Sequence, residues 1–314
     1  ARARGVRAAA LRGLGRMDEA ARDANVALKL SREAGDEQHA VEMLLAVGTA
    51  EFQLGDLGRA LARFDVAVFE ARALDLPDLE ASSLQQLGSV RASMGDAETA
   101  RAHYESALEV ARKNQNAMGE MRACAGLGSF FLEHEDHAAA EEHYERALMI
   151  ADREGAKRTY RIVLGYLGIL YFHAGELADA ERLLERAALL CRDVGDVRVE
   201  GIFGGIRAAV LAELDRVDES TFAFGVADKL LEPSPFFREA IRISRGHLDL
   251  AQARLARGRG LEAVEQSHLR AARYRVLASR APGRGDDPPI IARSDDARMA
   301  VNHLERAMER YKKA

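Results

Sequence analysis

Cysteine, proline and long apolar runs are scarce in this 314-residue chain, and each shortage excludes a class of protein. The two cysteines, Cys124 and Cys191, lie too far apart for a C-x-x-C motif and are too few for a disulfide framework, so we interpret them as reduced core residues. No run reaches the roughly 18 apolar residues that a membrane-spanning helix requires. The sequence therefore predicts a cytoplasmic protein without a membrane partner.

Excess charge of one sign is also lacking, since 45 basic residues stand against 50 acidic ones. Arginines are frequent between residues 236 and 280, but acidic residues are interspersed and aromatic residues that could stack on bases are few. We therefore do not expect direct contact with nucleic acid. With 48 % hydrophobic residues the chain can bury a core, which excludes low-complexity disorder outside residues 281–289.

A repeat with a period of 40 residues runs through most of the chain. Its turn recurs around Gly15, Gly55, Gly95, Glu135, Gly175 and Asp215, and a seventh copy is assigned to Gly258 after three extra residues. A small residue stands seven positions before each turn, and alanine, a bulky residue and alanine follow five, nine and twelve positions after most turns. Steps of four and three place these residues on one stripe of a helix. In the seventh copy, Ser267 and Arg270 replace the bulky residue and the second alanine.

Each copy is therefore predicted to be a pair of helices joined at the turn. Asp56, Asp96 and Asp136 are suited to cap the second helix of their pairs. All six prolines fall outside the predicted helix interiors, as the geometry of proline demands. The predicted fold class is all-α: a right-handed superhelical solenoid of about seven helical pairs plus one terminal helix.

At these residues the chain resembles the tetratricopeptide (TPR) repeat family. The period of 40 is similar to the longer-helix variety in kinesin light chains, Pins-type polarity scaffolds and the sensor arms of bacterial regulators related to the maltose activator. The resemblance implies a repeat array over residues 1–279, a Pro/Gly linker over 280–293 and an amphipathic helix over 294–314. Because the chain starts at Ala1-Arg2 without methionine, we also expect flanking domains of a longer polypeptide.

The resemblance further implies that the first helix of each pair lines a concave groove. Positions 2, 5, 9, 12 and 13 would face it when the turn glycine is position 15, and the lysine and asparagine residues of a carboxylate clamp are missing there. The predicted partner-groove residues become less polar along the chain; they are Gln85, Ser89, Ser129, Gly165, Tyr166, Ile169, Phe172, Phe203, Gly205 and Ala209. Helical spacing leaves the alternative open that the glycines and aromatics of this set pack between repeats.

No catalytic residue, cofactor or metal ligand is predicted. His134, His137 and His143 lack the i, i+4 spacing of a helical zinc pair, and no phosphate-binding loop or nucleophile with a base partner is visible. We therefore expect a non-enzymatic interaction and sensor module of a bacterial signalling or transcription regulator, with a protein segment, a peptide or a small effector as its partner. The alternative is a constitutive structural scaffold for a multiprotein assembly.

The last predicted helix follows Ser294, a suitable N-cap, and carries one mostly apolar face. That face could cap the array, lie in its groove or dock on another domain. We predict that it packs within the chain through Met299, Leu304 and Met308.

Overall fold

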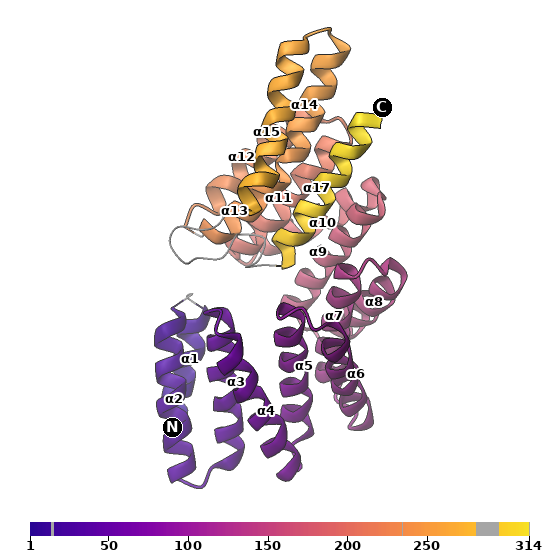
Figure 1. Ribbon diagram of the computed structural model, residues 1–314. Helices are drawn as coiled ribbons and strands as arrows, with labels where there is room; N and C mark the ends of the chain where they lie inside the picture. Colours follow the sequence, from indigo (N-terminus) through magenta and orange to yellow (C-terminus); the bar gives the residue numbers. More distant parts are fainter. Residues whose placement is uncertain (14–15, 234, 281–294, 314) are drawn as a thin grey trace. The chain divides into compact units, whose positions relative to one another are not determined.

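The computed structural model describes residues 1–13, 16–233, 235–280 and 295–313, and this part of the chain is helical without strands (Figure 1). The first eight helices are α1 (Arg2–Gly13), α2 (Met17–Glu33), α3 (Glu37–Gln53), α4 (Leu57–Ala73), α5 (Pro77–Ser93), α6 (Ala97–Lys113), α7 (Ala117–Glu133) and α8 (His137–Arg153). The others are α9 (Lys157–Ala174), α10 (Leu177–Arg192), α11 (Val197–Glu213), α12 (Val217–Leu230), α13 (Pro235–Ser244), α14 (Gly246–Gly258), α15 (Glu262–Arg280) and α17 (Asp295–Lys313).

Within the units, helices that follow one another in sequence pack side by side, from α1 to α6 and from α9 to α12, which confirms the predicted all-α repeat solenoid. The contacts divide the chain into two compact units. Unit 1 comprises residues 1–131 and 145–155, and unit 2 comprises residues 132–144 and 156–314. The proposed linker at 280–293 lies outside the described residues except for Arg280, and so does the proposed N-cap Ser294. None of the described helices is long and apolar enough to cross a membrane.

The predicted caps are present, and so are the turns at residues 55, 95, 135, 175 and 215, whereas the first predicted turn residue, Gly15, lies outside the described residues. Asp56, Asp96 and Asp136 each accept a hydrogen bond from the backbone N–H three residues later, at 3.0, 3.3 and 3.2 Å. Gly55 has a φ of 84°, a left-handed conformation that favours glycine. Glu135 and Asp215, which replace the turn glycine, have φ values of 62° and 59°. The packing of the paired helices therefore imposes the turn geometry even on residues that adopt it at a cost.

The assignment of the seventh turn to Gly258 is wrong by two residues. Gly258 ends α14, and Gly260 has the left-handed φ of 67°. Counted from Gly260, the stripe positions nine and twelve residues later hold Leu269 and Ala272, which pack in the core of unit 2. The stripe therefore continues through the seventh copy, whereas Ser267 and Arg270 had suggested that it is lost there. The extra residues lengthen the first helix of this pair, which is divided into α13 and α14.

The alanine and aromatic stripe forms the contacts between helices. Phe64 and Tyr144 are fully buried, as are the alanines that follow them three residues later. The small residue of the first helix explains how the ring fits: a Cβ on Gly48 would lie 2.6 Å from Phe64, and one on Gly88 would lie 2.7 Å from Tyr104. The glycine therefore makes room for the ring of its own pair.

Candidate functional site

A pocket of about 360 Å³ lies in unit 1 between α1 and the first helices of three successive pairs, α3, α5 and α7. This volume is within the range of small-ligand sites. The lining combines apolar residues of α1 and α3 with polar side chains; the polar ones are Arg12, Glu42, Thr49, Ser82, Gln85, Gln86 and Arg122. Among the predicted groove residues, Gln85 is in this lining, whereas Ser89 and Ser129 are not.

The repeat places equivalent side chains in a row across this pocket. Glu42, Ser82 and Arg122 occupy position 2 of successive first helices, 40 residues apart. The Arg122 guanidinium donates a hydrogen bond from Nη2 to Ser82 Oγ at 3.2 Å. Sequence reasoning identified position 2 as groove-facing but did not single out Arg122, although a basic residue at a groove position was the available signal.

Two charged side chains of the pocket, Glu42 and Arg122, differ in their contacts. Burial lowers the pKa of Arg122, an effect that the charge of Asp78 opposes. Glu42 is engaged by His39, whose Nδ1 lies 2.9 Å from its Oε2. Among the described residues, no carboxylate oxygen lies within 4 Å of the Arg122 guanidinium. The pocket therefore contains a half-buried cation without an ion-pair partner.

Ser89 and Ser129 use their hydroxyl groups within the helices. Ser89 Oγ donates to the carbonyl of Gln85 at 3.2 Å and accepts from the Tyr104 hydroxyl at 3.1 Å. Ser129 Oγ donates to the carbonyl of Ala125 at 3.1 Å. These bonds stabilise the repeat itself, so the two serines are less suited to recognition than Gln85.

In unit 2 most of the predicted groove residues pack between helices. A Cβ on Gly165 would lie 2.2 Å from the Phe203 ring, and one on Gly205 would lie 2.6 Å from Ile241. Ile169, Phe203 and Ala209 are 6 %, 3 % and 0 % exposed. This burial supports the alternative that sequence spacing left open, in which these residues are core between repeats. Spacing could not show it because core and groove stripes share the same helical period.

Two glycines of unit 2, Gly165 in α9 and Gly204 in α11, test this packing with one substitution each. Gly165→Ala is expected to destabilise unit 2 by about 1–2 kcal/mol, because overpacking against Phe203 outweighs the gain in helix propensity. A Cβ on Gly204 meets nothing within 4 Å, so Gly204→Ala should stabilise the protein by up to about 1 kcal/mol. Urea unfolding of both variants measures the two signs. A stabilising Gly165→Ala would contradict the close approach of Phe203.

Tyr166 and Phe172 lie among aromatic rings. Tyr166 stacks on Tyr144, with ring centroids 6.2 Å apart and planes at 14°, and meets the edge of Phe203. Phe172 is 4 % exposed, and the ring of His303 from α17 covers it at 4.2 Å between centroids. Phe172, a predicted groove residue, is therefore covered by a helix of the same chain.

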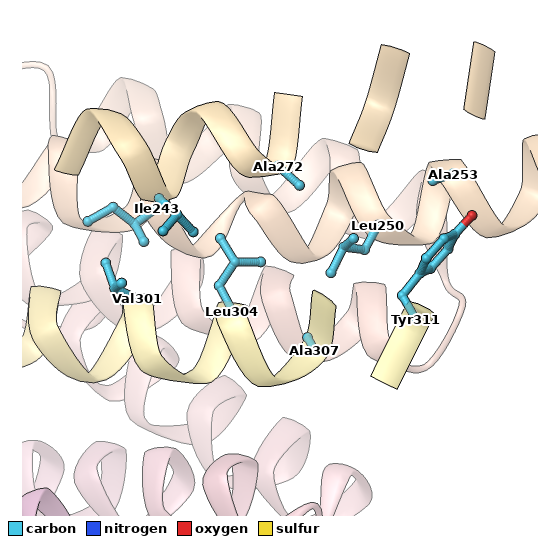
Figure 2. Packing of buried hydrophobic residues seen from close by; sticks show 9 residues of the cluster. Ile243, Leu250, Ala253, Ala272, Val301, Leu304, Ala307 and Tyr311 are labelled. Carbon is cyan, nitrogen blue, oxygen red and sulfur yellow. The ribbon is translucent and has the colours of Figure 1, made fainter. Parts of the chain in front are cut away.

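The C-terminal helix α17 packs within the chain, as predicted, against α13, α14 and α15. Figure 2 shows its apolar face turned toward these helices. The cluster contains Ile243, Leu250, Ala253, Ala272, Val276, Val301, Leu304, Ala307 and Tyr311, with Leu269 and Met308 packed against it. Leu304 and Met308 are confirmed as contact residues, whereas the side chain of Met299 lies outside the described residues.

A cluster of histidines lies beside this apolar contact. The Nδ1 atom of His303 lies 3.2 Å from His247 Nε2, and the rings of His173 and His303 are 4.7 Å apart. His247 donates from Nδ1 to the Glu213 carboxylate at 2.7 Å. Burial, together with nearby histidines and arginines, lowers the pKa of His173 to about 4 and lowers that of His303 further.

The described residues show no metal site, and some arginines of the basic stretch are paired with carboxylates. No group of three or more histidine, cysteine, aspartate or glutamate side chains there could hold a metal ion. Several arginines of the basic stretch form ion pairs: Arg254 with Asp215 at 3.1 Å, and Arg275 with Asp249 at 2.5 Å. These guanidinium groups are engaged in holding neighbouring helices together.

Comparison with known proteins decides the family. The model of the MalT-like TPR region matches residues 2–271. The chain belongs to the MalT-like TPR family. A search of curated proteins finds no relative of this MalT-like repeat region.

Solved structures share the fold at low identity. The apo form of RapI is 12 % identical with a TM-score of 0.61, and the alignment covers 87 % of this chain and 96 % of RapI. A Rap conjugation gene regulator in complex with a Phr peptide is 13 % identical with a TM-score of 0.58, covering 89 % and 78 %. A STAND protein with a tetratricopeptide repeat sensor from Pyrococcus horikoshii is 14 % identical with a TM-score of 0.61, covering 95 % of this chain and 46 % of that protein. The family's repeat fold is typical of non-catalytic interaction scaffolds.

Proposed function

We propose that this chain is the sensor and interaction module of a bacterial signalling or transcription regulator and that it binds a peptide segment or a small effector in the unit 1 pocket. The observation that carries the proposal is the pocket itself, whose lining combines polar side chains of three successive repeats with apolar side chains of α1 and α3. Such a lining can orient a ligand through a few hydrogen bonds while burying its apolar part. The module has no enzymatic role in this proposal.

Two of the structural relatives support this use of the fold. One is a gene regulator in complex with a peptide, and the other carries its repeats as the sensor of a signal transduction ATPase. By this analogy the chain would act beside an effector domain of a longer polypeptide. A cytoplasmic setting suits the buried thiols of Cys124 and Cys191.

The pocket can be tested by filling it. Gln86→Trp places an indole at the pocket lining, and Ala102→Trp adds the same group at an exposed site on α6. We would select peptides from a displayed library, and metabolites from the source cell, on the natural protein and measure the affinity of each for both variants by calorimetry. Gln86→Trp should weaken binding at least tenfold, while Ala102→Trp should leave it unchanged. Equal affinity for both variants would show that the ligands bind elsewhere.

The alternative, a constitutive scaffold, predicts a different result. Partners would then be retained without a ligand, and filling the pocket would have no effect on them. The full-length gene separates the two functions as well. An ATPase, kinase or DNA-binding module beside these repeats favours the sensor, and an array that stands alone favours the scaffold.

A further inference from the structure

The Arg122 guanidinium is an exception among the arginines of unit 1 that join neighbouring helices. Arg72 and Arg112 meet the carboxylates of Glu80 and Glu120 at 2.5 and 3.2 Å. Arg122 has one hydrogen bond, to the neutral hydroxyl of Ser82 at 3.2 Å, although a guanidinium has five N–H donors. Its burial removes water, and no carboxylate of the described residues replaces that water in direct contact; the charge of Asp78 compensates only in part. Placing a cation in this environment costs free energy that the fold of unit 1 does not recover.

The neighbouring side chains offer hydrogen-bond donors and no free negative charge. Gln85 and Gln86 line the pocket half-buried, and their amide groups make no hydrogen bond to the described residues. Arg12 brings a second cation from α1. The only carboxylate in the lining, Glu42, is already held by His39. The pocket is therefore complementary to a negative charge.

The apolar part of the lining indicates what the charge is attached to. Ala8, Ala9, Leu45 and Ala46 contribute apolar side chains to the same pocket as Arg122. A planar carboxylate on a short aliphatic chain fits this mixed lining, because the guanidinium can bind its two oxygens in parallel and the chain can lie on the apolar side chains. A carboxylate carries one negative charge, which matches a single buried arginine.

We propose that the unit 1 pocket recognises a carboxylate group, held by Arg122 with the amides of Gln85 and Gln86, on an aliphatic ligand. This inference rests on the proposed function of the pocket and specifies its ligand class. The carboxylate can come from a free aliphatic carboxylic acid or from an acidic side chain of a peptide. Arg122 then serves binding at the expense of the stability of the ligand-free protein.

Direct observation of the guanidinium tests the proposal without knowledge of the natural ligand. The probes are hexanoate with its neutral amide, and the capped peptide Ala-Glu-Ala with its Ala-Gln-Ala counterpart. Each is titrated into the whole chain while the Nε–Hε resonance of Arg122 is followed by NMR. We expect a saturable shift with at least one carboxylate probe at millimolar concentration and at least tenfold weaker binding of its neutral counterpart. The two probe pairs distinguish a free acid from a peptide as the source.

Two arginine variants complete the test. Arg122→Gln should weaken carboxylate binding at least tenfold, while Arg112→Gln, in the pair with Glu120 outside the lining, should leave it unchanged. Without ligand, Arg122→Gln should unfold at the same or a higher temperature than the natural protein. Equal binding of neutral probes, no binding of either acid, or a large loss of stability in Arg122→Gln would overturn the proposal.

The outcome is separable from that of the proposed function. A selected ligand that is neutral and is lost on Gln86→Trp would retain the pocket's sensor role and reject the carboxylate. Carboxylate binding at Arg122, together with selected partners indifferent to Gln86→Trp, would retain the recognition site and reject the sensor role.

Discussion

Leu304→Asp is expected to detach α17 from unit 2. Leu304 is fully buried, and its side chain occupies the space left by Gly246, where a Cβ would lie 2.3 Å from it. Losing the buried leucine removes about 1.5–3 kcal/mol, and an unpaired carboxylate at the same place costs several kcal/mol more. Because α17 makes its apolar contacts through a single face, we expect the remaining contacts to be too weak to keep the helix bound after this loss.

Hydrogen exchange measures the release. In the natural chain, amides of residues 301–311 should exchange slowly, and in Leu304→Asp they should exchange nearly as fast as those of an isolated helix. Asn302→Asp is the matched control, since it adds the same charge to an exposed position of α17 and should leave protection unchanged. Fast exchange in the natural chain would refute the intramolecular packing, and slow exchange in Leu304→Asp would refute the role of Leu304.

Acidification from pH 6.5 to pH 4 is expected to lower the stability of unit 2 by roughly 3 kcal/mol or more. The pKa of His173 falls to about 4 and that of His303 falls further on folding, so the unfolded chain binds more protons than the native one in this window. The contribution of these histidines to the free energy of unfolding is therefore present above pH 6.5 and is lost as the pH falls. Each pKa unit is worth about 1.4 kcal/mol, reduced here because His173 is partly exposed.

The surroundings of these histidines support the direction. The groups that act on these two histidines are bases, which carry a positive charge when protonated; they include His137, His247, Arg306 and Arg310. Burial would raise the pKa of Glu213, but the hydrogen bond and charge of His247 lower it overall, so this carboxylate also favours the native state until the pH falls below about 4.5. No anion other than Glu213 is in hydrogen-bond contact with His247 among the described residues.

The pH prediction is checked by thermal unfolding at pH 7, 6, 5 and 4. His303→Asn should be destabilised at pH 7 by the loss of packing on Phe172, but its stability should depend less on pH than that of the natural chain. His268→Asn, which changes a histidine of α15 outside the cluster, should retain the natural pH dependence. Equal pH profiles for all three proteins would reject the cluster as the cause.

Much of the fold could be predicted because a repeat presents the same physical signal several times. The capping aspartates, the turn glycines and the alanine stripe recur at the same spacing, so an error at one copy does not change the assignment. The seventh turn shows the limit. Gly258 and Gly260 both offer a turn glycine, and only the packing of Leu269 and Ala272 selects the second.

The candidate site was less predictable for a related reason. Gly165 and Phe203 have the helical spacing of a groove, yet they fill each other's space between two helices. The sequence shows a basic residue at a groove position in Arg122, but its lack of an ion pair becomes visible only when the neighbouring helices are in place. A sequence pattern shows which residues share one face of a helix, but it does not show which other part of the chain covers that face.

The repeat, its helical pairs and their caps can be read from the sequence, because these depend on contacts between residues that are close along the chain or one repeat apart. Which groove positions are covered depends on the packing of the helices. It places α17 over Phe172 in unit 2, and it leaves Arg122 beside an open pocket in unit 1. Both results depend on side chains brought together from distant helices, whose burial and charge balance no local spacing encodes.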